Sequence, residues 1–210
     1  YVIGGLDKQV GIECQVYTSE NNSWLFEFPS LPKGRFNSVC FVYRDSLYVF
    51  GGTDNSSNMN EIVRYDLSTQ NSGEWTTIAK VNEANQRGGV AFVVEDKVYA
   101  GLGEKSNGFR NGFYVSSDSL TKWELIPSIP AQLGVISSGV YDEQKKSFFM
   151  IDNDGKIWEY NLTTEQWTSR SLWIRMKNYH MFMLDGSIYI LGQDIYQKNK
   201  FTVYNPIWDN

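Results

Sequence analysis

Short apolar runs alternate with turn residues along the whole chain, and the stretch from Val39 to Trp75 shows the pattern most clearly. An apolar run over 39–43 is followed by a turn and a second apolar run over 47–50, and a polar loop then leads to an alternating segment over 61–66. Runs this short, rich in β-branched and aromatic residues, are typical of strands. No stretch shows a 3.6-residue period with helix caps. The pattern predicts four short antiparallel strands in each such unit, the fourth near Trp75.

Units of this kind repeat five times along the sequence. In each, an aromatic residue leads a run that ends in small residues, and a tyrosine and then a tryptophan follow, with equivalent anchors 40 to 51 residues apart. The leading aromatics are Tyr1, Tyr48, Tyr99, Phe149 and Tyr189, the tyrosines are Tyr17, Tyr65, Tyr114, Tyr160 and Tyr204, and the tryptophans are Trp24, Trp75, Trp123, Trp167 and Trp208. This recurrence indicates a repeat architecture. We expect one domain over 1–210, with repeats at roughly 1–35, 36–87, 88–135, 136–178 and 179–210.

The first strand of each unit is apolar at successive positions, as over 90–94, whereas 61–66 alternates with polar residues. A strand with one wet face would alternate, so we expect these inner strands to be buried on both faces, in small sheets stacked around an axis. Cys14 and Cys40 lie in apolar runs, and two cysteines make no disulfide framework. We therefore expect both to be small buried hydrophobic residues.

The second unit carries the clearest signature. Arg35, the run Leu47-Tyr48-Val49-Phe50-Gly51-Gly52, the segment Asn60–Asp66 and Trp75 together resemble the kelch repeat. The resemblance extends over essentially the whole chain and weakens in the later units, where the glycine pair is lost. It implies an all-β fold, a kelch-type β-propeller with four complete repeats plus a partial one.

The strand count bears on how the propeller closes. The inner strand recurs four times, near 39–43, 90–94, 136–141 and 179–184, while the glycine-ended strand recurs five times, because the sequence begins after the first inner strand. Propellers usually close by pairing strands, which removes open edges. Two alternatives stay open, an incomplete ring or part of a larger propeller, and we favour the larger propeller.

The repeated residue types have physical roles. A glycine pair such as Gly51-Gly52 lets the chain leave the sheet near the crowded axis, in conformations that other residues resist. Large aromatic side chains fill the wide gap between neighbouring blades. We expect Tyr65 and Trp75 to pack together, and Trp75→Ala to cost roughly 3–5 kcal/mol if the indole is fully buried.

Composition and charge narrow the classes of function. The chain of 210 residues has 15% aromatic residues, 18 glycines and a net charge of -5, and it lacks the clustered basic surface that nucleic acid requires. No apolar run approaches the roughly 18 residues of a membrane span. The segment 116–123 is similar to degenerate repeats of bacterial cell-envelope kelch proteins. We favour an envelope or secreted location over a cytoplasmic one.

Arginines beside the inner strands are the first candidate binding groups. Arg35 and Arg87 precede inner strands, where the kelch pattern often has arginine, and Arg175 lies near the last one. Three guanidinium groups near the mouth of the central channel would suit forked recognition of carboxylates or sugar hydroxyls. The alternative is a structural role, in which they donate hydrogen bonds to loop carbonyls between blades.

The loops that follow the glycine-ended strands are the second candidate. They cover 7–9, 53–60, 104–111 and 194–200, and we expect them to open on the same face as the loops that precede the inner strands. Phe109 and Trp173 are candidates to stack on a sugar or to anchor a peptide. The alternative is that these are ordinary solvated loops.

Catalytic and metal chemistry have weak support in the sequence. His180 is the single histidine, whereas kelch-type copper oxidases use two, so we expect no metal or other cofactor and interpret His180 as a packed or hydrogen-bonded residue. No catalytic triad order or phosphate loop occurs. The leading hypothesis is a non-enzymatic module that binds a protein or glycan. A carbohydrate-active enzyme of the sialic acid epimerase type and an architectural domain remain alternatives, and the oligomeric state stays open.

Overall fold

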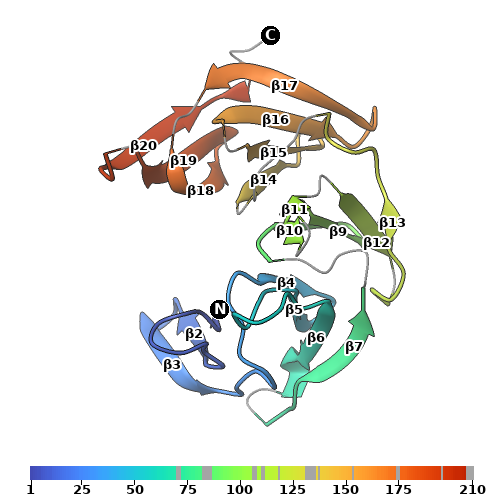
Figure 1. Ribbon diagram of the computed structural model, residues 1–210, viewed down its shortest axis with the longest axis vertical. Coiled ribbons are helices and arrows are strands. Elements are labelled where there is room, and N and C mark those ends of the chain that lie inside the picture. The colour runs from blue at the N-terminus through green and yellow to red at the C-terminus, as the bar shows by residue number, and fades with distance from the viewer. Residues whose placement is uncertain are drawn as a thin grey trace.

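The computed structural model describes residues 1–69, 72–81, 87–105, 108–109, 112–117, 119–130, 136, 138–152, 154–173, 176–194 and 196–206. Five antiparallel sheets follow one another in chain order around a common axis, with their inner strands toward the axis (Figure 1). This arrangement confirms the predicted all-β propeller, and each sheet is one blade. A 3-10 turn, η1 (Leu67–Thr69), follows β6, and no helix among the described residues is long and apolar enough to cross a membrane.

Within the described residues, three of the five blades have four main strands, and the first and last have three. Blade 1 holds β1 (Val2–Ile3), β2 (Cys14–Thr18) and β3 (Ser23–Phe28); blade 2 holds β4 (Val39–Tyr43), β5 (Ser46–Phe50), β6 (Glu61–Asp66) and β7 (Thr76–Lys80); blade 3 holds β8 (Val90–Val94), β9 (Lys97–Gly101), β12 (Phe113–Ser117) and β13 (Glu124–Leu125); blade 4 holds β14 (Gly139–Asp142), β15 (Ser147–Ile151), β16 (Lys156–Asn161) and β17 (Gln166–Trp173); blade 5 holds β18 (Lys177–Leu184), β19 (Ser187–Gln193) and β20 (Asn199–Tyr204). A short hairpin of β10 (Glu104–Lys105) and β11 (Gly108–Phe109) extends from blade 3.

The glycine pairs lie where the chain passes close to the next linker. Gly51 and Gly52 have φ values of 66° and 91°, in the left-handed region that favours glycine. A Cβ atom on Gly4, the counterpart of Gly51 in blade 1, would lie 2.3 Å from the carbonyl oxygen of Arg35. Both the backbone conformation and the close approach therefore require glycine here, as the repeat predicts.

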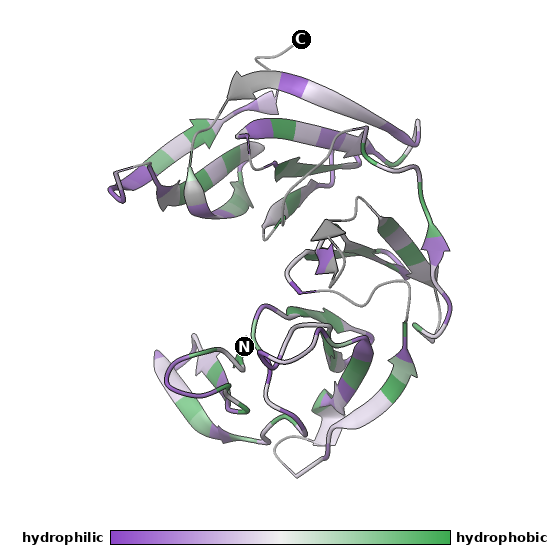
Figure 2. Cartoon of the chain, viewed as in Figure 1, coloured by the Kyte–Doolittle hydropathy of each residue, from purple (hydrophilic) through white to green (hydrophobic). Residues whose placement is uncertain are grey.

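The hydrophobic core is divided among the contacts between successive blades. We call the side of a blade that packs on the following blade its front face, and the opposite side its back face. The front face of blade 2, with Phe41, Tyr48, Phe50 and Ile62, packs on Ala100 and its neighbours on the back of blade 3. Equivalent clusters join blades 1 and 2, 3 and 4, and 4 and 5. Figure 2 shows the corresponding hydrophobic bands along the strands.

In blades 2 and 4 a tryptophan connects the blade to the one before it, as the aromatic spacing predicts. The Trp75 ring lies 5.4 Å from the Tyr65 ring, and its Nε1 donates a hydrogen bond to the Pro29 carbonyl of the preceding blade at 2.9 Å. Trp167 makes the same bond to the Pro127 carbonyl, 40 residues upstream, at 2.6 Å. Trp75 is half-buried and not fully buried. Trp75→Ala should therefore lower the free energy of unfolding by less than the upper end of the range expected for a fully buried indole.

The prediction that inner strands are buried on both faces is wrong at Val93 of β8 and at Phe182 and Leu184 of β18, which are exposed. It is also wrong for β4. Its buried and exposed residues alternate, and Cys40 and Val42 are exposed on the back face. The physical reason is that this face is directed toward blade 1, whose three strands include no inner strand to cover it. The expected burial of Cys40 is therefore wrong, whereas Cys14, on the front face of blade 1, is buried as predicted.

Candidate functional site

Loops from two parts of the repeat meet at one end of blades 2 and 3. The linker before β4 pairs with the loop after β5 through the Phe36–Thr53 bridge, and the linker before β8 pairs with the loop after β9 through Arg87–Glu104. Asn58 also donates from Nδ2 to the Glu104 carbonyl at 3.1 Å, which joins the loops of blades 2 and 3. In these two blades the loops therefore share one face, as the sequence predicts.

Arg35 lies at the base of this face and is completely buried, at 0% exposure. Its Nη1 donates to the Gly51 carbonyl at 3.2 Å, and its Nη2 lies 3.8 Å from a carboxylate oxygen of Glu61. Burial lowers the pKa of the Arg35 guanidinium, and the negative charge of Glu61 partly offsets this effect. The guanidinium therefore occupies the position expected of the structural alternative, a hydrogen bond to a loop carbonyl between blades.

Arg87 occupies a different position in the repeat, although both arginines precede inner strands. The backbone bridges place Arg87 opposite Glu104 and Phe36 opposite Thr53, so Arg87 is the counterpart of Phe36 and not of Arg35. A shift of one residue along an extended segment turns the side chain to the other side. The sequence spacing contains the signal for this offset, because Arg35 lies four residues before Val39 and Arg87 lies three residues before Val90.

The Arg87 side chain is 42% exposed and is held by a carboxylate. Its Nε donates to Glu104 Oε2 at 2.7 Å, and this hydrogen bond together with the charge of Glu104 raises the pKa of Arg87. The pair presents donors and carboxylate acceptors next to one another in a fixed orientation.

A second ion pair lies on the neighbouring loop. Lys33 Nζ is 2.7 Å from Asp54 Oδ2, and Asp54 also accepts hydrogen bonds from the backbone N–H groups of Ser56 and Ser57. The Lys33 and Ser56 hydrogen bonds hold the pKa of Asp54 well below its usual value. The loop over 53–58 is thereby tied to the linker before β4, and its polar groups are held in place.

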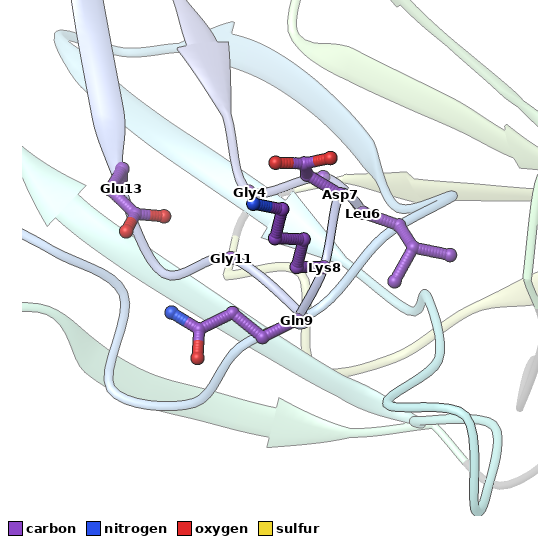
Figure 3. Close-up of a pocket in the computed structure, with 8 residues that line it drawn as sticks. Gly4, Leu6, Asp7, Lys8, Gln9, Gly11 and Glu13 are labelled. Atoms are coloured by element: carbon purple, nitrogen blue, oxygen red, sulfur yellow. The ribbon is translucent and has the colours of Figure 1, made fainter.

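A pocket of about 680 Å³ lies beside these loops in blade 1. Its lining residues are Gly4, Gly5, Leu6, Asp7, Lys8, Gln9, Gly11 and Glu13, and they include the predicted loop 7–9. Figure 3 shows the Gln9 and Glu13 side chains on one side of this loop and the Leu6 side chain on the other. The Arg35 backbone fixes the base of the pocket, because its carbonyl accepts from the Gly5 N–H at 2.9 Å and its N–H donates to Gly11.

The remaining candidates lie partly or wholly outside the described residues. Phe109 is in β11 opposite Glu104, and Trp173 ends β17 opposite Lys156, but their side chains are outside the described part of the chain, as is Arg175 altogether. His180 is on β18 and is exposed, so the prediction of a packed histidine is wrong. Within the described residues, no group of three or more histidine, cysteine or acidic side chains could hold a metal ion.

Comparison with known proteins agrees with the repeat pattern and the fold. A family model described as the Kelch motif matches residues 34–82, which span blade 2 and the linker that carries Arg35. The solved structure of YjhT is similar to the chain with a TM-score of 0.78 at 15% identity, covering 97% of this chain and 80% of the YjhT chain. No curated protein matches the chain. The motif and the fold together show a kelch-repeat propeller.

Proposed function

For this kelch-repeat β-propeller, we propose a non-enzymatic binding function in which the loops of the Arg87 end hold a protein or glycan ligand. The observation that carries the proposal is the partly exposed Arg87–Glu104 pair, which a backbone bridge in blade 3 and the Asn58 bond from blade 2 hold in place. Binding groups are commonly placed on loops that a rigid scaffold positions. The Asn58 contact and the Lys33–Asp54 pair hold the adjacent loop in the same way.

The charges at this end favour a polar ligand without a large net charge. The positive Arg87 and Lys33 are each paired with a carboxylate, and the pocket in blade 1 is lined by Asp7, Lys8 and Glu13. A surface of alternating donors and acceptors suits sugar hydroxyls or the peptide groups of a protein loop. The phosphate groups of nucleic acid would meet more acidic than basic side chains here, since Glu104, Asp54, Asp7 and Glu13 outnumber Arg87, Lys33 and Lys8.

A binding screen with matched arginine variants tests this function. We expect Arg87→Ala to weaken binding to the strongest ligand of a glycan array or pull-down by roughly tenfold, because a charge-assisted hydrogen bond contributes about 1.5–3 kcal/mol. The control is Arg44→Ala, which removes an exposed arginine from the β4–β5 turn, where it pairs with Asp96. Equal losses in the two variants would contradict the proposed location.

A direct assay of activity distinguishes the enzymatic alternative from the binding function. Proton NMR of free sialic acid with the protein measures the rate of anomeric interconversion against buffer. A rate well above buffer that Arg87→Ala abolishes would replace the binding proposal by the epimerase hypothesis. Absence of any retained glycan or protein in the screen would overturn the binding proposal without regard to that assay.

A further inference from the structure

The outer strand of blade 3 is shorter than its counterparts in the neighbouring blades. The strand β13 has two residues, whereas the outer strands β7 and β17 have five and eight. Its partner β12 has five residues, of which only Tyr114 and Val115 pair with β13. Among the described residues, the outer edge of β12 therefore has no paired strand beyond Val115, and the chain takes another path before β13 begins.

A hollow of about 410 Å³ lies at this edge of the sheet, and we call it the blade 3 hollow. It is lined by Val115 and Ser116 of β12, by Lys97 at the start of β9, and by side chains of the segment 119–124 that leads into β13. Its volume falls in the range of sites that bind small molecules. The hollow belongs to a blade that has a neighbouring blade on either side.

The segment that lines the hollow is held in place by contacts on its inner side. The buried hydroxyl of Ser116 donates a hydrogen bond to the Lys122 carbonyl at 2.6 Å. Leu120 is also buried, and its carbonyl accepts a hydrogen bond from Trp123 Nε1 at 3.0 Å. The Trp123 ring stacks on Phe50 of blade 2 at 5.9 Å. The polar side chains of the segment are therefore presented from a fixed backbone.

Two ammonium groups and two hydroxyl groups line the blade 3 hollow. Lys97 and Lys122 are exposed, and neither forms an ion pair with a carboxylate of the described residues. The hydroxyl oxygens of Ser119 and Thr121 lie 2.8 Å apart and share one hydrogen bond. Because each hydroxyl carries one proton, the pair keeps a second proton that it can donate to a ligand. Ammonium and hydroxyl donors together are suited to an oxyanion.

One carboxylate of the described residues, that of Glu124, lines the same hollow. An ionised carboxylate repels an anion, but it accepts a hydrogen bond from an anion that still carries a proton. A phosphate monoester is such an anion below its second pKa of about 6, and near neutral pH a fraction of it keeps this proton. Sulfate has no proton to donate at this pH. The two lysines with Glu124 therefore favour phosphate over sulfate.

We propose that the blade 3 hollow binds the phosphate group of a small phosphomonoester such as a hexose phosphate. Lys97 and Lys122 pair with the phosphate oxygens, and Glu124 accepts a proton-mediated hydrogen bond from the phosphate. The hollow is larger than a phosphate group alone requires, which leaves room for the carbon skeleton of the ester. Lys97 begins β9, whereas Glu104, the partner of Arg87, follows the other end of β9. The site is thus distinct from the loops of the Arg87 end, and Figure 1 shows β12 and β13 at the outer rim of the ring.

Titration of the isotope-labelled protein, followed by NMR at constant ionic strength, tests the site. The probes are inorganic phosphate, inorganic sulfate, a hexose phosphate and the unmodified hexose, and the amide signals of Ser119 and Thr121 report on the hollow. We expect both phosphates to bind with a millimolar or lower Kd, sulfate to bind several-fold more weakly, and the unmodified hexose to cause no shift. Binding of the unmodified hexose as tight as that of its phosphate would overturn the proposal.

Charge-changing variants with a matched control identify the groups that hold the phosphate. Lys97→Gln and Lys122→Gln should each weaken phosphate binding by roughly tenfold, because each removes a charge-assisted hydrogen bond. Glu124→Gln should strengthen sulfate binding and reduce the preference for phosphate, which a purely structural role of Glu124 would not do. The control is Lys146→Gln, which removes an exposed lysine from the β14–β15 turn and should leave binding unchanged. An unchanged Tm confirms that each variant is folded.

Three outcomes would contradict the phosphate site. They are the absence of saturable shifts with either phosphate, phosphate binding that survives the combined Lys97→Gln and Lys122→Gln substitutions, and equal weakening by Lys146→Gln. Arg87→Ala, which tests ligand binding at the loop end, should leave the phosphate titration unchanged. Failure of the phosphate site and failure of the proposed binding function are therefore distinguished, because each is measured with its own ligand and its own variants.

Discussion

Two tyrosine–tryptophan pairs in this protein have the same local geometry and opposite surroundings. The ring centroids of Tyr17 and Trp24 in blade 1 lie 5.4 Å apart, and the angle between the ring planes is 55°. The centroids of Tyr65 and Trp75 in blade 2 also lie 5.4 Å apart, with an interplanar angle of 51°. Blade 1 packs against the second pair, while the first pair is exposed. The strands set the pairing of the rings, and the neighbouring blade decides whether the pairing contributes to a core.

The largest expected effect is the difference between the two tyrosines. Tyr65→Ala should lower the free energy of unfolding by about 3–5 kcal/mol, because it leaves a cavity among Phe28, Leu47 and Val63. Tyr17→Ala should cost about 1 kcal/mol or less, since its ring is already half in water. Urea denaturation of both variants measures the contrast. Equal losses would mean that blade 1 has a covering partner in solution.

Substitution of Arg35 by alanine should lower the stability more than substitution of Arg87, as with the buried and exposed tyrosines. Arg35→Ala removes the buried partner of the Gly51 carbonyl and of Glu61, and we expect a loss of about 2–4 kcal/mol, reduced from that of a fully buried pair because Lys80 also contacts Glu61. Arg87→Ala breaks a partly exposed pair and should cost about 1 kcal/mol or less. Thermal denaturation distinguishes them, and a larger loss for Arg87 would reverse our assignment of the structural arginine.

A smaller effect should separate the two tryptophans. Trp75→Phe keeps an aromatic ring but leaves the Pro29 carbonyl without its indole donor, and it should cost about 1 kcal/mol. Trp24→Phe should be close to neutral, because Trp24 is exposed at the uncovered back face. Equilibrium unfolding in urea with matched m-values checks this pair. Similar costs for the two substitutions would contradict the role of the Pro29 hydrogen bond.

The two cysteines should differ in their reactivity toward an alkylating reagent, which can be compared without any substitution. Burial raises the pKa of Cys14 to about 11, and the surrounding protein atoms also raise the pKa of Cys40, but only Cys40 has an exposed surface. We expect Cys40 to react with iodoacetamide at pH 8 and Cys14 to be protected until the protein unfolds, since the thiolate is the reacting form. Peptide mapping after a short exposure identifies the modified residue. Preferential labelling of Cys14 would contradict the described packing of blade 1.

The candidate site was predictable only in part. The positions of its loops follow from the repeat, and the loop 7–9 that the repeat predicts lines the pocket in blade 1. The two arginines looked equivalent in the sequence, but a one-residue difference in their linkers buries Arg35 and leaves Arg87 half-exposed. The roles of Arg175, Phe109 and Trp173 remain predictions.

The order and spacing of aromatic and glycine residues were sufficient to determine the blades and the main strands within them. These features depend on contacts within one repeat, such as the pairing of β5 with β6, and a repeat contains the information for them. Burial of Tyr17 and Cys40, and the separate environments of Arg35 and Arg87, were decided only in the tertiary structure. The physical reason is that each depends on a surface contributed by another blade or linker, which the local pattern of a repeat does not contain.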